Sequence, residues 1–190
     1  MQIENTPLAG VKILTPRRFD DDRGFFAETY NRKVLAENGI TLDFVQDNHS
    51  FSTAAGTVRG LHFQTAPFAQ DKLVRCAQGA LFDVAVDIRK GSPTYGKWFG
   101  VELSFENGRQ LLIPAGFAHG FVARVDNTVI AYKCSNFYAG DCEGALLWND
   151  PDIGIDWALN GLEPVLSGKD EIAPNLAGFD SPFTWQEPAK

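Results

Sequence analysis

Short runs of β-forming residues, separated by turn signals, recur along most of this 190-residue chain. Segments such as Asp22-Arg23-Gly24 and Glu106-Asn107-Gly108 separate these runs, and their Gly, Asn and Asp residues favour tight turns. Many short strands spaced in this way are typical of a sandwich or a barrel. The predicted strands are residues 11–15, 25–30, 44–51, 58–64, 72–76, 81–89, 98–103, 110–113, 119–125, 129–137 and 144–148.

Helix is expected in only two places. Residues 31–39 begin with Asn31, a favourable N-cap, and end at Gly39, a residue type common just after a helix. A further turn or two of helix is expected around residues 169–172. Because the length suits one hydrophobic core and no repeat or linker interrupts the pattern, we predict a single domain over residues 1–190, with a C-terminal extension of loops and short helix.

Charge and cysteine content narrow the classes of function and the compartment. The net charge of −7 argues against a nucleic-acid or membrane partner, which needs clustered Lys and Arg. The N-terminus has no basic region followed by an apolar run, and no segment approaches membrane-spanning length. The three cysteines are odd in number and lack Cys-x-x-Cys spacing, so we predict a cytoplasmic protein.

The strand predicted at residues 81–89 alternates clearly between two kinds of side chain. Its large apolar residues share one face, and the other face carries Asp83, Ala85 and Asp87. This second face either lines a water-filled cavity or faces bulk solvent. From this strand alone, we favour the solvent-exposed face and leave Asp83 as a candidate contact inside a cavity.

The histidines of the chain are too few for a typical cupin metal site. Residues 108–119 have the spacing of the second cupin motif, which ends at His119. His62 follows Gly56 at the spacing of the first ligand position of the first motif, but the next ligand position holds Gln64 and the expected Glu is missing. Because a mononuclear cupin site uses several histidines plus a carboxylate, we predict the jelly-roll scaffold without a metal.

The surroundings of His62 can be predicted from the alternation of the strand at residues 58–64. Strict alternation puts Arg59 and Leu61 on one face of that strand. It puts Gly60 beside His62 on the other face, where the missing side chain of Gly60 would leave room for a ligand. A lone histidine in a strand is more often structural than catalytic, so this pattern alone is only suggestive.

Longer segments carry a pattern that is more specific than any single motif. They are residues 22–28, 44–50, 58–64, 71–75, 82–89, 91–96, 113–121, 132–134, 147–151 and 166–170. Together they resemble the dTDP-4-dehydrorhamnose 3,5-epimerase family, at close to the family's spacing and nearly from end to end. The resemblance implies an all-β fold, a cupin-like jelly-roll barrel of two antiparallel sheets with few short helices.

The resemblance also implies four catalytic residues. His62 corresponds to the base and Tyr132 to the acid on the opposite side of the sugar. Asp170 should hydrogen-bond the far nitrogen of the imidazole, which would fix its tautomer. Lys72 is a cation suited to the oxygen of an enolate intermediate.

Substrate-binding residues follow from the same resemblance. Arg23 and Arg59 correspond to diphosphate contacts, because a guanidinium can bind phosphate oxygens in a bidentate manner. Tyr138 corresponds to the position that stacks on the thymine ring. The other implied ligand-binding residues are Glu28, Gln46, Asp47, Asn48, His119, Glu143 and Lys169.

The implied activity is the epimerisation of dTDP-4-dehydro-6-deoxy-D-glucose at C3 and C5, which gives dTDP-4-dehydro-L-rhamnose for dTDP-L-rhamnose biosynthesis. The ketone at C4 acidifies both C–H bonds, so no metal or organic cofactor is expected. The family further implies a homodimer whose N-terminal strands cross between protomers. The alternatives are an epimerase acting on one carbon, a keto-isomerase, a metal-dependent cupin oxygenase and a non-catalytic nucleotide-sugar binding module.

Overall fold

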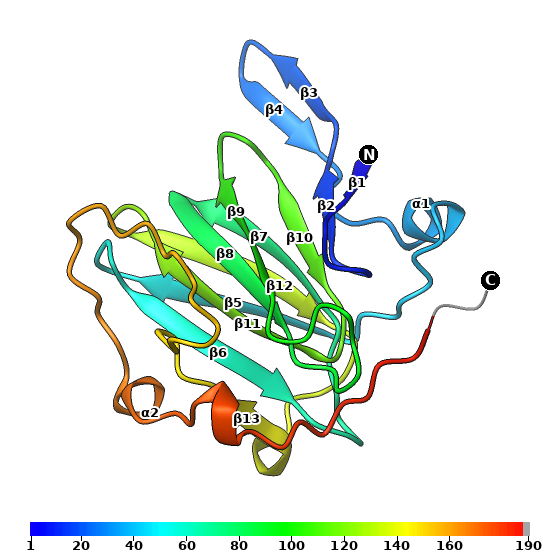
Figure 1. Cartoon of the computed structure of the whole chain (residues 1–190). Coiled ribbons are helices and arrows are strands. Elements are labelled where there is room, and N and C mark those ends of the chain that lie inside the picture. The colour runs from blue at the N-terminus through cyan, green and yellow to red at the C-terminus, as the bar shows by residue number, and fades with distance from the viewer. Residues whose placement is uncertain (188–190) are drawn as a thin grey trace.

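Two antiparallel β-sheets face each other and form the body of the protein in a computed structural model that describes residues 1–187 (Figure 1). The six-stranded sheet has the order β1 (Gln2–Asn5), β2 (Lys12–Thr15), β10 (Gln110–Ile113), β7 (Lys72–Gln78), β12 (Thr128–Cys134) and β5 (Gln46–Ser52). The five-stranded sheet has the order β13 (Glu143–Ala145), β6 (Val58–Gln64), β11 (Phe117–Ala123), β8 (Ala80–Asp87) and β9 (Trp98–Ser104). The predicted all-β, jelly-roll-like fold of two antiparallel sheets is confirmed.

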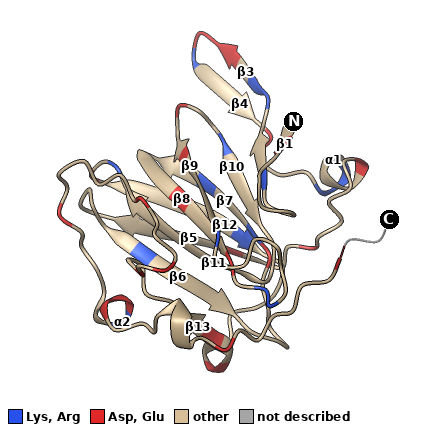
Figure 2. Ribbon diagram, viewed as in Figure 1, with Lys and Arg blue, Asp and Glu red and all other residues tan. Residues whose placement is uncertain are grey.

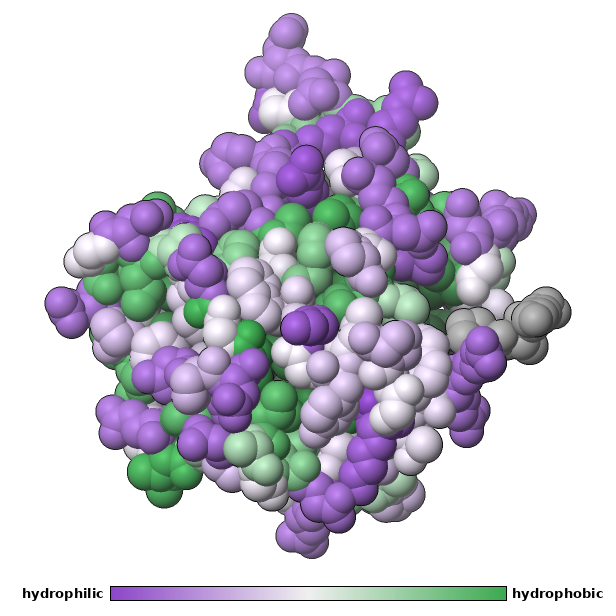
Figure 3. Space-filling view, in the orientation of Figure 1, coloured by the Kyte–Doolittle hydropathy of each residue, from purple (hydrophilic) through white to green (hydrophobic). Residues whose placement is uncertain are grey.

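A two-stranded hairpin projects away from this body. It consists of β3 (Arg18–Asp21) and β4 (Gly24–Ala27), which pair only with each other. Figure 3 shows the hairpin as a knob above the rounded body. Neither β1 nor β3 was among the predicted strands, because both lie at the periphery and bury few side chains, so they lack an apolar alternation.

The few helices are short, as the sequence predicts. Helix α1 (Arg32–Glu37) is capped by Asn31, whose side-chain oxygen accepts hydrogen bonds from two backbone N–H groups, and Gly39 follows it with a φ of +78°. Helix α2 (Gly168–Glu171) falls where the second helical turn was expected, and two 3-10 turns lie at Gly140–Cys142 and Leu176–Gly178. Within residues 1–187, no helix has the length and apolar character needed to cross a membrane.

The hydrophobic core fills three layers. The central layer lies between the two sheets, and a second layer covers the outer face of the five-stranded sheet with residues from the C-terminal segment, such as Ile153 and Trp157. A third layer packs Leu35 of α1 beside β2 and β10. Both faces of β8 are therefore buried, and the preference for a solvent-exposed face at Asp83 and Asp87 is wrong: each has 0% exposure.

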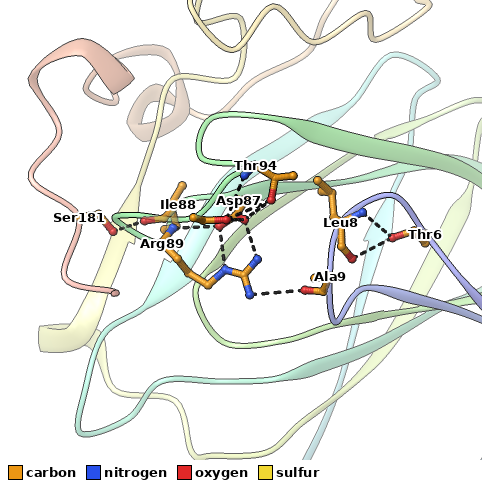
Figure 4. Close-up of polar contacts among 9 residues, drawn as sticks. Thr6, Leu8, Ala9, Asp87, Ile88, Arg89, Thr94 and Ser181 are labelled. Carbon is orange, nitrogen blue, oxygen red and sulfur yellow. Dashed lines mark hydrogen bonds and ion pairs between the residues drawn. The ribbon is translucent and has the colours of Figure 1, made fainter. Parts of the chain in front are cut away.

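A buried ion pair anchors the end of β8 (Figure 4). Asp87 Oδ1 accepts hydrogen bonds from the backbone and side chain of Arg89, and Asp87 Oδ2 accepts from Arg89, Ser92 and Thr94 at 2.6 Å each. Burial opposes ionisation, but these hydrogen bonds outweigh it and hold the pKa of Asp87 below its usual value.

Arg89 also contacts residues near both ends of the chain. Its Nη1 donates to the carbonyl of Ala9, and its guanidinium lies 4.2 Å from the ring centre of Phe117 and 4.3 Å from that of Trp185. Ser181 donates a hydrogen bond to the carbonyl of Ile88 in the same region (Figure 4). The network therefore joins residues near both termini to the five-stranded sheet.

Asp87→Asn is expected to lower the free energy of unfolding by about 3 kcal/mol, because it leaves the buried Arg89 charge without its partner. Since the folded-state pKa of Asp87 is depressed, its stabilising effect is present above about pH 4 and is lost as the pH falls through the folded-state pKa. Chemical denaturation at pH 7 and pH 3 measures both effects. Asp43→Asn removes an exposed ion pair with Arg32 and should change stability by less than about 0.5 kcal/mol; equal losses in the two variants would contradict this account.

Candidate active site

A cavity of about 500 Å³ opens between the two sheets. Strands of both sheets contribute to its wall, and so does the segment of residues 165–170 that leads into α2. The lining residues are Ser50, Phe51, Ser52, Thr53, Thr57, Val58, Arg59, His62, Lys72, His119, Phe121, Tyr132, Val165, Leu166, Ser167, Lys169 and Asp170. All four predicted catalytic residues are in this set.

A β-bulge in β6 brings Arg59 and His62 to the same wall. His62 lies opposite His119 on β11, whereas Arg59 lies opposite Phe121, so three steps along β6 match two steps along β11. All four of these side chains line the cavity. The expectation that Arg59 and His62 lie on opposite faces is wrong, because the alternation is interrupted between them.

Gly60 serves close packing of the two strands. A Cβ atom at Gly60 would lie 2.5 Å from the Cα of Gly120 and 2.8 Å from the carbonyl oxygen of His119, and its φ is +131°. The prediction that Gly60 leaves room for a ligand is therefore wrong, because the backbone of β11 occupies that space. Its glycine is needed for the bulge and for the approach of β11.

His62 forms a hydrogen-bonded pair with a buried carboxylate. Its Nε2 lies 2.6 Å from Oδ1 of Asp170, and the two side chains are 24% and 3% exposed. Asp170 lies on α2, where Ser167 caps the helix and accepts a hydrogen bond from the backbone N–H of Asp170. Burial lowers the pKa of His62 and outweighs the opposing effect of Asp170, so the imidazole is neutral at pH 7.

Tyr132 and Lys72 enter the cavity from the opposite sheet, on β12 and β7. Burial raises the pKa of the Tyr132 phenol, which keeps its proton at neutral pH. Burial also lowers the pKa of Lys72, while the charges of Cys134 and Asp83 oppose that shift. Within the described chain, the Lys72 ammonium makes no side-chain hydrogen bond or ion pair, so its N–H groups are available to a ligand.

Three of the predicted substrate-binding residues also line the cavity: Arg59, His119 and Lys169. Arg59 donates to the carbonyl of Phe51, and Lys169 forms an ion pair of 3.1 Å with Glu143. Glu143, another predicted binding residue, therefore lies next to a lining residue although it does not line the cavity itself.

Other predicted binding residues form a separate polar group on β5 and the loop after β12. Gln46 accepts a hydrogen bond from the backbone N–H of Tyr138 and donates one to Asn48. Asp47 points to the other side of β5, where it pairs with Lys133 at 3.0 Å. These four residues are not among those that line the cavity.

Arg23 and Glu28 lie on or next to the projecting hairpin rather than at the cavity. Arg23 pairs with Asp21 at 2.6 Å, and its side chain is 89% exposed. The fold therefore brings neither residue to the cavity of this chain.

Several other residues lie at or near the cavity, and of these only Asp83 was predicted as a candidate cavity contact. Asp83 lies behind His119, and its Oδ1 is 2.7 Å from His119 Nε2. The alternation of the strand at residues 81–89 was the available signal for it. Hydroxyl residues such as Ser50 and Thr57 also line the cavity, and nothing in their spacing distinguishes them from surface residues.

The donor atoms around His62 do not converge as metal ligands would. Among residues 1–187, no group of three or more His, Cys, Asp and Glu side chains is placed to hold a metal ion. Gln64 occupies the position where the first cupin motif places its second metal ligand. Its amide donates to the carbonyls of Phe68 and Phe137 and accepts from the N–H of Ala139. Figure 2 shows basic and acidic positions interspersed along the ribbon.

Known proteins are similar to this chain in both sequence and fold. The model of the dTDP-4-dehydrorhamnose 3,5-epimerase family matches residues 5–178. The dTDP-4-dehydrorhamnose 3,5-epimerase of Salmonella typhimurium is 54% identical over 177 residues, which are 93% of this chain and 96% of that protein. The crystal structure of the enzyme of the same name from Bacillus anthracis, with TDP and PPi bound, is 51% identical with a TM-score of 0.89, over 92% of this chain and 99% of that one.

A further solved structure holds a nucleotide sugar. The dTDP-6-deoxy-D-glucose-3,5-epimerase of Legionella pneumophila, in complex with dTDP-4-keto-L-rhamnose, is 46% identical with a TM-score of 0.93, over 98% of this chain and 99% of that one. The matched regions include the strands and the segment that together form the cavity described above. This chain belongs to the dTDP-4-dehydrorhamnose 3,5-epimerase family.

Proposed function

We propose that this cavity epimerises dTDP-4-dehydro-6-deoxy-D-glucose at C3 and C5, with His62 as the base and Tyr132 as the acid. One observation supports this assignment above all others: a neutral imidazole and a protonated phenol come from opposite sheets and line one cavity. Inversion of a carbon centre needs proton removal on one face of the sugar and proton return on the other.

The hydrogen bond to Asp170 identifies the reacting atom of His62. An ionised carboxylate only accepts, so Nε2 carries the proton in the neutral ring and Nδ1 holds the free lone pair. Nδ1 therefore takes the proton from the carbon beside the ketone, and Asp170 stabilises the imidazolium that forms. The free Lys72 ammonium stabilises the negative charge that develops on the ketone oxygen.

Nucleotide binding requires cations at the diphosphate and a flat surface at the base. Arg59 and Lys169 line the cavity and supply positive charge. Tyr138 is 62% exposed beside Gln46 and Asn48, which suits stacking and hydrogen bonding to a thymine ring. Asp47 is the weakest of the proposed contacts, because its side chain is paired with Lys133 on the other side of β5.

The projecting hairpin supports a homodimer. Phe19 and Phe26 on the hairpin are 50% and 68% exposed, which favours coverage by another surface. If Arg23 and Glu28 bind substrate, they reach the cavity of a second protomer, as crossing N-terminal strands would allow. Light scattering at micromolar concentration should give the mass of a dimer, and a monodisperse monomer would refute this part.

The free cysteines suit a reducing compartment, so we place the protein in the cytoplasm.

The activity is tested by incubating the protein with the keto-sugar nucleotide in deuterated water without added metal. Deuterium at both C3 and C5, with both centres inverted, is the expected NMR result. Labelling and inversion at one carbon would assign a single epimerase, and a moved carbonyl would assign a keto-isomerase. Tight dTDP binding without exchange would assign a binding module, and turnover only after a metal is added would assign a metal enzyme.

The pH profile should depend on neutral His62. Because its pKa lies below the usual 6.5, the acid limb of kcat/KM should fall below pH 6.5. Asp170 raises this pKa, so Asp170→Asn should move the limb to still lower pH while it also lowers the maximal rate. An acid limb that stays in place in this variant would contradict the assignment of His62.

A further inference from the structure

A second histidine–carboxylate pair lies on the same cavity wall as the first. His119 is the register partner of His62, and both side chains line the cavity. Its Nε2 lies 2.7 Å from Oδ1 of Asp83 on β8. The side chains are 9% and 0% exposed, so this pair is more deeply buried than the pair of His62 and Asp170.

Asp83 is bonded differently from Asp87 and Asp150, two other buried carboxylates. Its Oδ2 is the one buried side-chain polar atom in residues 1–187 that has no hydrogen-bond partner. Asp87, four residues further along β8, uses both oxygens, and so does Asp150, which accepts from backbone N–H groups including that of Leu176. A buried carboxylate with a single donor is costly unless that donor carries a positive charge. Asp83 is therefore poorly suited to a purely stabilising role.

We propose that Asp83 is a positioning residue that holds Nε2 of His119 and so makes this imidazole a cationic donor, through Nδ1, to an oxygen of the bound nucleotide sugar. The proposal rests on the function proposed above. An ionised Asp83 requires a proton on Nε2, which leaves Nδ1 with a lone pair in the neutral ring. A ketone or phosphate oxygen needs a donor, so ligand binding favours a second proton on the ring. Asp83 balances the resulting charge.

Among the charged groups around His119, the carboxylate of Asp83 is the one placed to stabilise a positive charge on the imidazole. The titratable groups that share its cavity are Arg59 and His62 of β6, Lys72 of β7, Tyr132 of β12, and Lys169 and Asp170 of the segment leading into α2. Four of these carry or can carry positive charge and oppose a cation at His119, whereas Asp170 is hydrogen-bonded to His62. Asp83 is the carboxylate in contact with His119, and its charge also favours the ammonium form of Lys72.

The protonation of His119 can be followed directly, because the chain has only three histidines. We would titrate the imidazole nitrogens by ¹⁵N NMR, with and without saturating dTDP-D-glucose, a nucleotide sugar that lacks the ketone; His49→Asn and His62→Asn assign the signals. The ligand is expected to raise the titration midpoint of His119. Asp83→Asn should lower that midpoint by about one pH unit or more. Asp87→Asn, a buried carboxylate on the same strand, should leave it in place.

Two NMR results would overturn the proposal. One is a His119 midpoint that is the same in Asp83→Asn as in the unmodified protein. The other is an imidazole that stays neutral in the ligand complex between pH 6 and pH 8. Neither result depends on turnover, so a failure of the proposed function would be seen separately, as a lack of deuterium exchange in the unmodified protein.

Kinetics of a double variant test whether Asp83 acts through His119. Asp83→Asn should reduce kcat/KM by about tenfold or more, and the basic limb of its pH profile should move to lower pH because the imidazolium loses its anion. In a His119→Asn background, Asp83→Asn should have no further effect. Losses that simply multiply would assign Asp83 a role separate from His119 and would overturn the proposal.

Discussion

His62→Asn is expected to abolish deuterium exchange at C3 and C5 and to reduce kcat/KM by roughly 10²–10⁴-fold. The asparagine side chain has no basic nitrogen, so the variant loses the Nδ1 lone pair that removes the proton from the sugar carbon. The amide still occupies a similar volume and can hydrogen-bond Asp170, so the cavity should keep its shape. Proton NMR in deuterated water measures exchange, and calorimetry with dTDP should show binding close to that of the unmodified protein.

His49→Asn is the matched control for this variant. His49 is an exposed residue of the same residue type on β5, away from the residues that line the cavity. Its exchange rates and dTDP affinity should match those of the unmodified protein. Persistent exchange in His62→Asn at the unmodified rate would rule out His62 as the base and would leave the role of the cavity to be assigned to other groups.

Strand positions were predictable where a strand is central and well patterned. The bounds of β6 and β10 agree with the predicted ranges 58–64 and 110–113. Strand β3 was missed, because its sequence Arg-Phe-Asp-Asp pairs only with β4 and carries no buried face. Apolar and polar residues alternate along a strand when one of its faces is buried. A strand that buries few side chains therefore shows no such alternation in its sequence.

Which residues form the site was easier to predict from the sequence than how these residues are arranged. Alternation assumes a regular strand, and the bulge near Gly60 reverses the face of Arg59 relative to His62. The pairing of His62 with Asp170 spans 108 positions, and no local pattern encodes a contact at that separation. The resemblance to a family supplied it instead. Whether other segments cover the outer face of a sheet depends on the tertiary fold, which local sequence patterns do not show. For this reason, the prediction of a solvent-exposed face on β8 was wrong.

Tyr132→Phe is expected to separate proton exchange from inversion. The variant keeps the ring but loses the phenolic proton, so the sugar loses the proposed proton donor on the six-stranded sheet. His62 still removes a proton, exchanges it with solvent through its partly open wall, and returns deuterium to the same face of the sugar. Substrate should therefore gain deuterium with retained configuration, while formation of inverted product falls by roughly 10²–10³-fold.

Tyr30→Phe provides the control for this variant, because Tyr30 packs edge-on against Phe44 and does not line the cavity. NMR separates the two readouts in one sample, since deuterium content and configuration at each carbon are measured independently. Tyr30→Phe should keep the unmodified ratio of inversion to exchange. Inverted product formed at an undiminished rate by Tyr132→Phe would mean that solvent or another side chain supplies the second proton. The opposed imidazole and phenol would then not be the source of inversion, because a base on one wall gives inversion only when a different group protonates the enolate from the other.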